Sequence, residues 1–112
     1  MAIILALVRD LIFASRITAT ARAQGVDVRL LRDPAALGAE AGARLLVDLN
    51  QSGALDAAAA WKRVDPAGRE VIGFVSHVDT ETIAAARAAG IDQVLARSAF
   101  ATKLPDLLSA AH

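Results

Sequence analysis

The chain has 112 residues, with twelve basic and twelve acidic side chains and no cysteine. This length fits one domain, residues 1–112, that buries about two-thirds of the surface its unfolded chain exposes. A net charge of zero gives no long-range attraction to nucleic acid or to an anionic membrane, so we expect neither as a partner. The lack of cysteine excludes disulfides, thiolate zinc sites and cysteine nucleophiles.

The first eight residues are apolar, but the apolar run stops at Arg9. This run is too short to span a membrane, and it lacks the basic lead and the cleavage site of a signal peptide. We therefore expect a cytoplasmic protein.

Apolar residues are continuous over 2–8 rather than alternating, which predicts a central strand buried on both faces. Asp10 can cap the helix that follows, and Gly25 is a typical residue to end it. Between them, apolar side chains recur every four positions and form one stripe toward the core: Phe13, Ile17 and Ala21. The pattern predicts a first helix over 11–24.

A second strand is expected over 26–31. Asp33 and Pro34 then form a helix start, with the acid as N-cap and the proline at the first helical position. The short helix that they begin is expected to end at Gly42.

The third strand carries the strongest functional signal. Leu45, Leu46 and Val47 are three large apolar residues, and the lone carboxylate of Asp48 follows them. This pattern predicts a strand buried on both faces that ends by placing one acid at the carboxyl edge of a sheet. Ligands of open α/β sheets gather at this edge, so Asp48 is the first candidate for a site.

The rest of the chain continues the alternation of strands and helices. The expected elements are a helix over 54–63, a strand over 71–75, a helix from Asp79 or Thr80 to Gly90, a strand over 93–95 and a helix over 99–111. Pro105 should kink or restart the last helix unless it lies in the first turn. Five such alternations with short connections imply a parallel sheet with right-handed crossovers and helices on both faces.

The carboxyl ends of these strands deliver a set of polar residues to one edge. The set consists of Arg9, Asp10, Asp48, Ser76, His77, Arg97 and Ser98. We expect these side chains to lie near one another if the sheet is parallel.

Three segments give the chain a family resemblance. They are Val47 to Gly53 around Asp48, Val71 to Val78 with Ser76, and Gly90 to Arg97. Together they make nearly the whole chain similar to the receiver domains of bacterial two-component response regulators, the family of the chemotaxis response regulator. The resemblance implies a single flavodoxin-like α/β domain with a five-stranded sheet of order 2-1-3-4-5.

The resemblance also implies roles for individual residues. Asp48 would be the phosphoacceptor, and Ser76 and Arg97 would contact the phosphoryl group. The metal ligands would be Asp10, Asp48 and the Asn50 carbonyl. Phosphoryl transfer to a carboxylate brings anions together, which is why such a site uses a hard cation and a basic side chain.

Three residues depart from the family pattern. Arg9 replaces one acid of the family's acidic pair, Arg97 replaces the family's lysine, and Val94 replaces an aromatic residue. With fewer carboxylates, the site should bind Mg²⁺ weakly and require no cofactor. We hypothesise that Arg9 takes the place of the metal by pairing with Asp48.

The polar residues at this edge also have structural interpretations. Asp10 can be an N-cap without any metal, Ser76 alone means little, and Arg9 and Arg97 can be surface charges. His77 can modify phosphoryl hydrolysis or simply face solvent. Trp61 is expected to pack at a helix end.

Three classes of function follow from this reading. The first is a stand-alone, atypical receiver, not an enzyme, that binds a histidine kinase or output protein through the last two helices and the fifth strand. Homodimers would use the same surface. The second class is a small-molecule-binding flavodoxin-like domain or enzyme, but no GxGxxG, P-loop or GxSxG motif is present. The third is a structural module that associates through alanine-rich helix faces.

Overall fold

The computed structural model of the protein describes residues 4–75 and 79–109. Its strands, in chain order, are β1 (Ile4–Leu7), β2 (Val28–Leu31), β3 (Arg44–Asp48), β4 (Glu70–Val75) and β5 (Gln93–Ala96). Its helices are α1 (Leu11–Gln24), the 3₁₀ helix η1 (Pro34–Ala39), α2 (Ala54–Val64), α3 (Thr80–Ala88) and α4 (Arg97–Ser109). Strands and helices alternate along the chain, as predicted.

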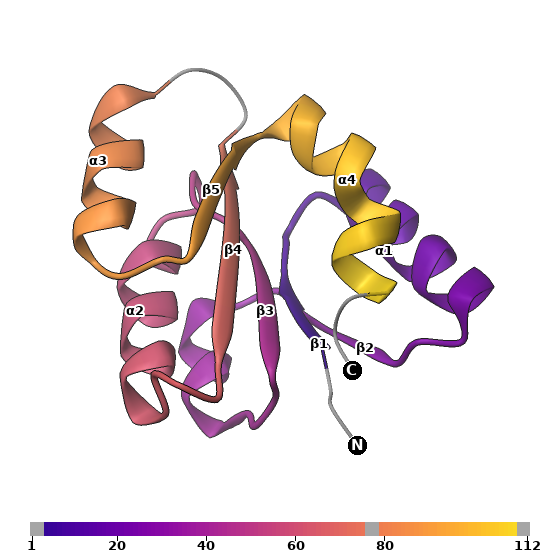
Figure 1. Cartoon of the computed structure of the whole chain (residues 1–112), viewed down its shortest axis with the longest axis horizontal. Helices are drawn as coiled ribbons and strands as arrows, with labels where there is room; N and C mark the ends of the chain where they lie inside the picture. Colours follow the sequence, from indigo (N-terminus) through magenta and orange to yellow (C-terminus); the bar gives the residue numbers. More distant parts are fainter. Residues whose placement is uncertain (1–3, 76–78, 110–112) are drawn as a thin grey trace.

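The five strands form one parallel sheet in the order β2-β1-β3-β4-β5 (Figure 1). Leu7 on β1, for example, lies opposite Leu31 on β2 and Val47 on β3. The strand order 2-1-3-4-5 that the resemblance implied is therefore confirmed. Because β1 and β3 are central, the residues that follow them emerge in the middle of the carboxyl edge.

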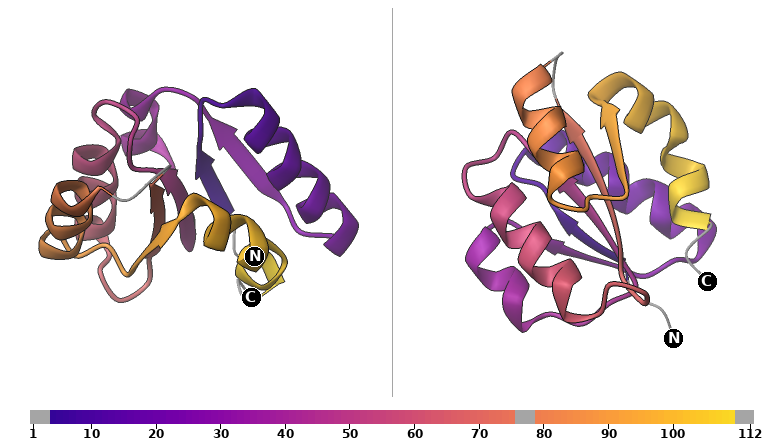
Figure 2. Two further views of the ribbon diagram at one scale, coloured as in Figure 1. Left: turned by 90° about the horizontal axis from the view of Figure 1, so that it is seen from above. Right: turned by 60° about the vertical axis from the view of Figure 1, so that its left-hand side comes forward.

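Helices cover both faces of the sheet, also as predicted. The helices α1 and α4 lie on one face, and α2, α3 and η1 lie on the other (Figures 1 and 2). Each face has its own buried cluster, and successive residues of β1 contribute to different clusters, as Ile4 and Leu5 do. The predicted stripe of α1 is buried, with exposed fractions of 5%, 0% and 2% for Phe13, Ile17 and Ala21.

Aspartate side chains cap the starts of three of the described helices, α1, η1 and α3. The Asp10 Oδ1 atom accepts hydrogen bonds from the N–H groups of Ile12 (3.0 Å) and Phe13 (3.2 Å) at the start of α1. At the other end of α1, Gly25 adopts the left-handed φ of 69° that closes the helix. The other aspartate caps, at the starts of η1 and α3, are Asp33 and Asp79.

The helix after Asp33 is shorter and tighter than predicted. It is a 3₁₀ helix that ends at Ala39, with hydrogen bonds such as that from the Glu40 N–H to the Leu37 carbonyl (3.0 Å). Only Leu37 in this helix is buried, so little apolar contact supports a longer α-helix.

The last helix begins two residues earlier than predicted. It begins at Arg97, directly after β5, and continues past Pro105 to Ser109 without restarting. Proline inside a helix costs about 3 kcal/mol, because it removes one hydrogen bond and crowds the preceding turn. Four buried side chains of α4 offset this cost by anchoring the helix to the sheet; they are Phe100, Leu104, Leu107 and Leu108.

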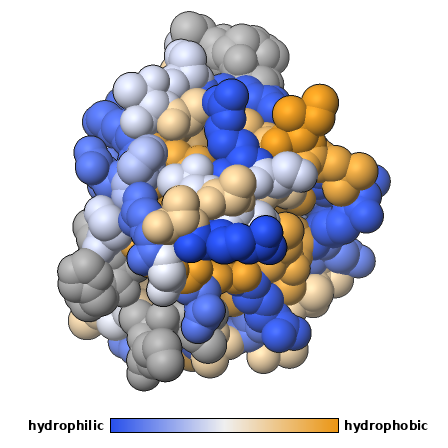
Figure 3. Space-filling model, turned by 90° about the vertical axis from the view of Figure 1, so that its right-hand side faces the viewer, coloured by the Kyte–Doolittle hydropathy of each residue, from blue (hydrophilic) through white to orange (hydrophobic). Residues whose placement is uncertain are grey.

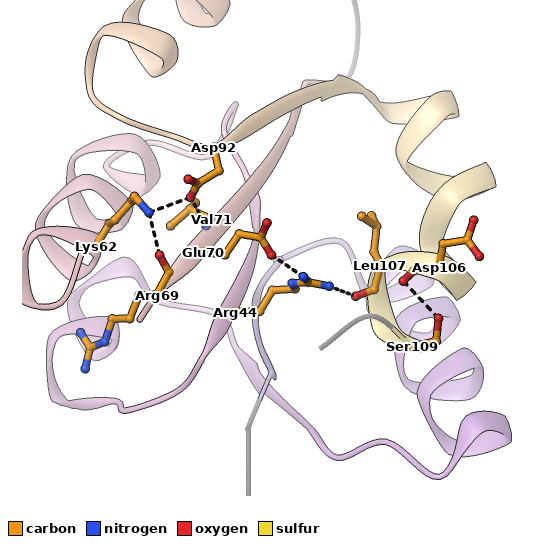
Figure 4. Close-up of polar contacts among 9 residues, drawn as sticks. All are labelled: Arg44, Lys62, Arg69, Glu70, Val71, Asp92, Asp106, Leu107 and Ser109. Atoms are coloured by element: carbon orange, nitrogen blue, oxygen red, sulfur yellow. Dashed lines mark hydrogen bonds and ion pairs between the residues drawn. The ribbon is translucent and has the colours of Figure 1, made fainter. Parts of the chain in front are cut away.

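Ion pairs and hydrogen bonds to the backbone link the strands and helices at the amino edge of the sheet (Figure 4). Arg44 at the start of β3 pairs with Glu70 at the start of β4 and donates a hydrogen bond to the Leu107 carbonyl of α4. The Lys62 ammonium of α2 lies 2.9 Å from the Asp92 carboxylate, which also accepts a 2.7 Å hydrogen bond from the backbone of β4. These contacts tie both helical layers to the sheet.

Within the part of the chain that the structure describes, no helix is both long and apolar enough to cross a membrane.

Candidate functional site

The carboxyl edge of the sheet brings together most of the residues that the sequence singled out. Arg9 and Asp10 follow β1, Asp48 ends β3, and Arg97 follows β5 directly. The expected positions Ser76 and His77 lie outside the described residues.

Asp48 is held at this edge by the turn that follows it. Its Oδ1 atom accepts a 3.0 Å hydrogen bond from the Asn50 N–H, and its backbone carbonyl accepts a 3.2 Å bond from the Gln51 N–H. The next residue, Leu49, is buried and donates its N–H to the Phe74 carbonyl of β4 at 3.0 Å. Asp48 is half-buried, and its carboxylate is bonded to the backbone of the loop that follows it.

A glycine makes room for that loop. An ideal Cβ on Gly73 of β4 would lie only 2.5 Å from the Cδ1 atom of Leu49. Any side chain at this position would displace Leu49, which comes directly after Asp48. Gly73 therefore fixes the packing of the residue that follows the candidate phosphoacceptor.

Asp10 uses both of its carboxylate oxygens within the protein. Oδ1 caps α1, and Oδ2 forms an ion pair with the Arg97 guanidinium at the start of α4. The pKa of Asp10 is lowered, first by the hydrogen bond from Arg97 and then by the one from the Phe13 N–H. Asp10 is therefore a charged structural partner of Arg97 and of the helix.

An aromatic cluster lies beneath this ion pair. The rings of Phe13, Phe74 and Phe100 have centroids 4.5 to 5.6 Å apart. The Arg97 guanidinium carbon is 4.6 Å from the Phe13 ring centroid, within the range of a cation–π contact. Arg97 is thus fixed between a carboxylate and a ring.

Arg9 does not make the pair that the sequence suggested. Among residues 4–75 and 79–109, Asp48 forms no ion pair with Arg9, and the arginine that reaches a carboxylate at this edge is Arg97. The side chain of Arg9 is exposed and lines a cavity with Arg32 of the β2–η1 connection. The hypothesis of an Arg9–Asp48 pair is therefore wrong for this structure.

The carboxylates that the resemblance assigned to a metal ion both have partners within the protein. No group of three acidic or histidine side chains that could hold a metal ion is found within the described ranges. Of the two carboxylates that the resemblance assigned to the metal, Asp10 is engaged by Arg97 and by the helix, and Asp48 accepts from the Asn50 N–H. A cation would have to displace Arg97 to gain a second carboxylate.

Two exposed apolar residues at the same edge were not singled out by the sequence analysis. Leu11 and Ile12, in the first turn of α1, are exposed by 64% and 84%. Figure 3 views the side of the molecule that carries α1 and α4, where hydrophobic residues lie at the surface among charged ones. A helix start with two consecutive large apolar residues was the signal that could have found them.

The comparisons with known proteins give no sequence relative. No protein-family model and no curated protein matches the chain. Solved structures do match it, over nearly its whole length. A response regulator protein from Burkholderia pseudomallei, with a phosphorylated aspartic acid, a calcium ion and citrate, is 20% identical with a TM-score of 0.79, covering 100% of this chain and 67% of that one.

Two further matches give the same result. The BeF3-activated DrrB receiver domain is 16% identical with a TM-score of 0.81, covering 98% of this chain and 96% of that one. NtrX from Brucella abortus is 19% identical with a TM-score of 0.79, covering 98% of this chain and 26% of that one. The chain has the fold of a response-regulator receiver domain. In this receiver fold, the carboxyl edge described above is where Asp10, Asp48 and Arg97 gather.

Proposed function

We propose that the chain is an atypical receiver-like signalling module, not an enzyme, that acts by binding a protein partner in the cytoplasm. In this proposal phosphorylation of Asp48 is not the ordinary switch, and the chain needs no cofactor. The observation that carries the proposal is the engagement of Asp10, whose two oxygens serve the α1 cap and Arg97.

The charge and the geometry of Asp10 and Arg97 both oppose an ordinary phosphorylation site. A receiver-type phosphorylation site needs a divalent cation held by carboxylates and a free basic side chain for the phosphoryl group. Here the carboxylate of Asp10 and the guanidinium of Arg97 neutralise each other. The side chain of Arg97 also ends in a planar guanidinium, whereas a lysine ends in a compact ammonium group, so the two do not bind a phosphoryl group in the same way. Mg²⁺ binding by Asp10, Asp48 and the Asn50 carbonyl should therefore be weak.

Asp48 remains the proposed phosphoacceptor for any phosphorylation that does occur. Its place at the end of a central strand supports this assignment, and the Burkholderia protein of the same fold carries a phosphorylated aspartic acid. Ser76 and Arg97 are the proposed contacts of the phosphoryl group, and His77 is proposed to modify its hydrolysis.

The proposed partner is a histidine kinase or an output protein, bound through α3, β5 and α4. The same surface is proposed for homodimers. The helix α4 supports this choice because it begins with Arg97, so a protein bound to α4 would contact the element that holds Asp10.

Incubation with acetyl phosphate and millimolar Mg²⁺, followed by intact mass measurement, tests the proposal. We expect the unaltered protein to gain no stoichiometric phosphoryl group. The double variant Arg9→Asp with Arg97→Lys restores the family's residues at both positions and should gain one, and adding Asp48→Asn to it should remove the gain. Stoichiometric modification of Asp48 in the unaltered protein would show an ordinary receiver and refute the proposal.

A further inference from the structure

A second feature of the carboxyl edge is a cavity of about 420 Å³ where β1, β2 and β3 end. Six residues line it: Arg9, Arg32, Asp33, Pro34, Gln51 and Ser52. We call it the Arg9–Arg32 cavity. Asp48 and Asp10 are not among its lining residues, whereas Arg9 belongs both to the cavity and to the predicted set of edge residues.

The fold brings the two arginines together. Leu7 and Leu31 are opposite each other on β1 and β2, and the Val8 N–H continues the pairing with a 3.1 Å bond to the Leu31 carbonyl. Arg32 follows Leu31 directly, and Arg9 follows Val8. The loop after β3 lies against the loop after β2, because the Gln51 Nε2 atom donates a 2.7 Å hydrogen bond to the Arg32 carbonyl.

The position of the cavity is one that favours ligands. The chain leaves β1 for α1 on one face of the sheet and leaves β3 for α2 on the other face. Neighbouring strands whose connections diverge in this way open a crevice outside their carboxyl ends, which is where open α/β sheets bind ligands. The lining residues come from the loops after β1, β2 and β3.

The charge of the cavity is positive. Within residues 4–75 and 79–109, neither Arg9 nor Arg32 forms an ion pair, whereas Arg29, Arg44 and Arg97 pair with Glu40, Glu70 and Asp10. One acid, Asp33, also lines the cavity, but its Oδ1 accepts the Ala35 N–H at 3.0 Å as the cap of η1. Two guanidinium groups against one carboxylate leave a surplus of one positive charge.

We propose that the Arg9–Arg32 cavity binds the phosphate group of a small phosphate monoester. A guanidinium presents paired N–H donors that match phosphate oxygens, and two guanidiniums can bind different oxygens of one tetrahedral dianion. The Ser52 hydroxyl lines the same cavity and can donate a further hydrogen bond. The volume exceeds that of a phosphate ion, which leaves space for the organic part of an ester beside Pro34 and Gln51.

Titration of the ¹⁵N-labelled protein with inorganic phosphate and with ribose 5-phosphate tests this site, with chloride at matched ionic strength as the reference. We expect saturable amide shifts centred on residues 9, 32–33 and 51–52, with the ester bound more tightly than inorganic phosphate. If inorganic phosphate binds as tightly as the ester, the assignment to an ester is wrong. Shifts centred elsewhere, or no difference from chloride, would refute the site altogether.

Matched variants assign the binding to the two arginines. Arg9→Gln and Arg32→Gln should each weaken ester binding about tenfold, because each removes charge-assisted hydrogen bonds to the phosphate. Arg16→Gln is the control, since Arg16 is an exposed arginine of α1 that does not line the cavity. All three changes are at exposed side chains, and unchanged thermal unfolding would verify that the fold is intact. Equal affinities in all variants, or an equal loss in the control, would contradict the proposal.

The variant Asp48→Asn separates this site from phosphorylation. It removes the proposed phosphoacceptor, yet ester binding should persist because Asp48 does not line the cavity. Loss of binding in this variant would contradict the proposal. Phosphorylation of the unaltered protein by acetyl phosphate would refute the proposed function without affecting this inference.

Discussion

The two edges of the sheet use charge in opposite ways. At the amino edge, Arg44 and Lys62 are largely buried and each is paired with a carboxylate and with backbone carbonyls. At the carboxyl edge, Arg9 and Arg32 are exposed and form no ion pair within the described residues. A buried charge that is paired cannot lose its partner without leaving the other charge uncompensated, whereas convergent charges without partners are available to a ligand.

The amino edge illustrates how completely such groups can be satisfied. The Lys62 ammonium contacts the Asp92 carboxylate and the carbonyls of Pro66 and Arg69, at 2.9, 3.2 and 2.6 Å. These contacts use the three N–H donors of a lysine. The Lys62 ammonium therefore has no donor left for a further molecule, and we interpret its contacts as structural.

The carboxyl edge has one pair of the same kind, between Arg97 and Asp10. This pair joins the start of α4 to the start of α1, whereas Arg9 and Arg32 form no ion pair within residues 4–75 and 79–109. The carboxyl edge therefore has one part where charges are paired, at Arg97 and Asp10, and one part that is open to a ligand, at Arg9 and Arg32. Function is expected at the open part and at Asp48.

The largest contrast between the edges should appear when arginines are removed. Arg44→Ala should lower the free energy of unfolding by about 2 kcal/mol, because Glu70 and the Leu107 carbonyl lose a partly buried charged partner. Arg32→Ala should change it by less than about 0.5 kcal/mol, as is usual for an exposed side chain. Urea unfolding of both variants measures the difference. Equal effects would remove the distinction between a structural and a functional edge.

The next effect concerns the support of Asp48 rather than its charge. Gly73→Ala should cost about 1 kcal/mol, since the new Cβ would lie 2.5 Å from Leu49 Cδ1 and force that side chain to move. Amide shifts should concentrate on residues 48–53. The matched control is Gly38→Ala, where a Cβ has no neighbour within 4 Å. If the shifts stayed within β4, the proposed support of the loop after Asp48 would be wrong.

Acid should weaken the Arg97–Asp10 contact. The pKa of Asp10 is lowered in the folded state, mainly by the hydrogen bond from Arg97, so the unfolded chain binds a proton there more readily. Its contribution to stability is present above the ordinary aspartate pKa of about 3.9 and is lost as pH falls through the lower folded pKa. Asp10→Asn should therefore reduce the loss of stability on acidification. Urea unfolding at several pH values measures this, with the exposed Asp27→Asn as control; identical pH slopes in both variants would contradict it.

The smallest expected effect is a gain of metal binding. Arg9→Asp adds a carboxylate beside Asp10 and removes one cation, which should create a measurable Mg²⁺ site. At a Mg²⁺ concentration equal to Kd, the stabilisation is about 0.4 kcal/mol. Thermal unfolding with and without Mg²⁺ measures this gain, and Arg16→Asp controls for charge alone. A response no larger than in the control would mean that Arg9 is not what prevents metal binding.

Much of the fold could be predicted from short-range patterns. Continuous apolar runs such as 45–47 identified buried strands, and the caps Asp10 and Asp33 marked helix starts within a few residues. The strand order came from the resemblance, because periodicity alone does not order parallel strands. The sequence left open whether Pro105 kinks or restarts the last helix, since the burial that holds α4 together past Pro105 depends on contacts far away in sequence.

The partners within the site were harder to predict. The sequence identified Asp10, Asp48 and Arg97 as neighbours, but it paired Asp48 with Arg9 rather than Asp10 with Arg97. Which side chains meet at an edge depends on where each strand ends relative to its helix, and the immediate start of α4 at Arg97 was not predicted. Arg32 was missed because nothing in its local sequence distinguishes it from a surface arginine.

The direct junction of β5 and α4 has a mechanical consequence. Ala96 is the last residue of the strand and Arg97 is the first of the helix, so no hinge separates them. The backbone of Arg97 therefore has a fixed place at the end of the sheet, and a tilt of α4 would shift its guanidinium relative to Asp10. A protein that binds the later turns of α4 and tilts this helix would therefore displace the Arg97–Asp10 ion pair, and with it the cap of the first turn of α1.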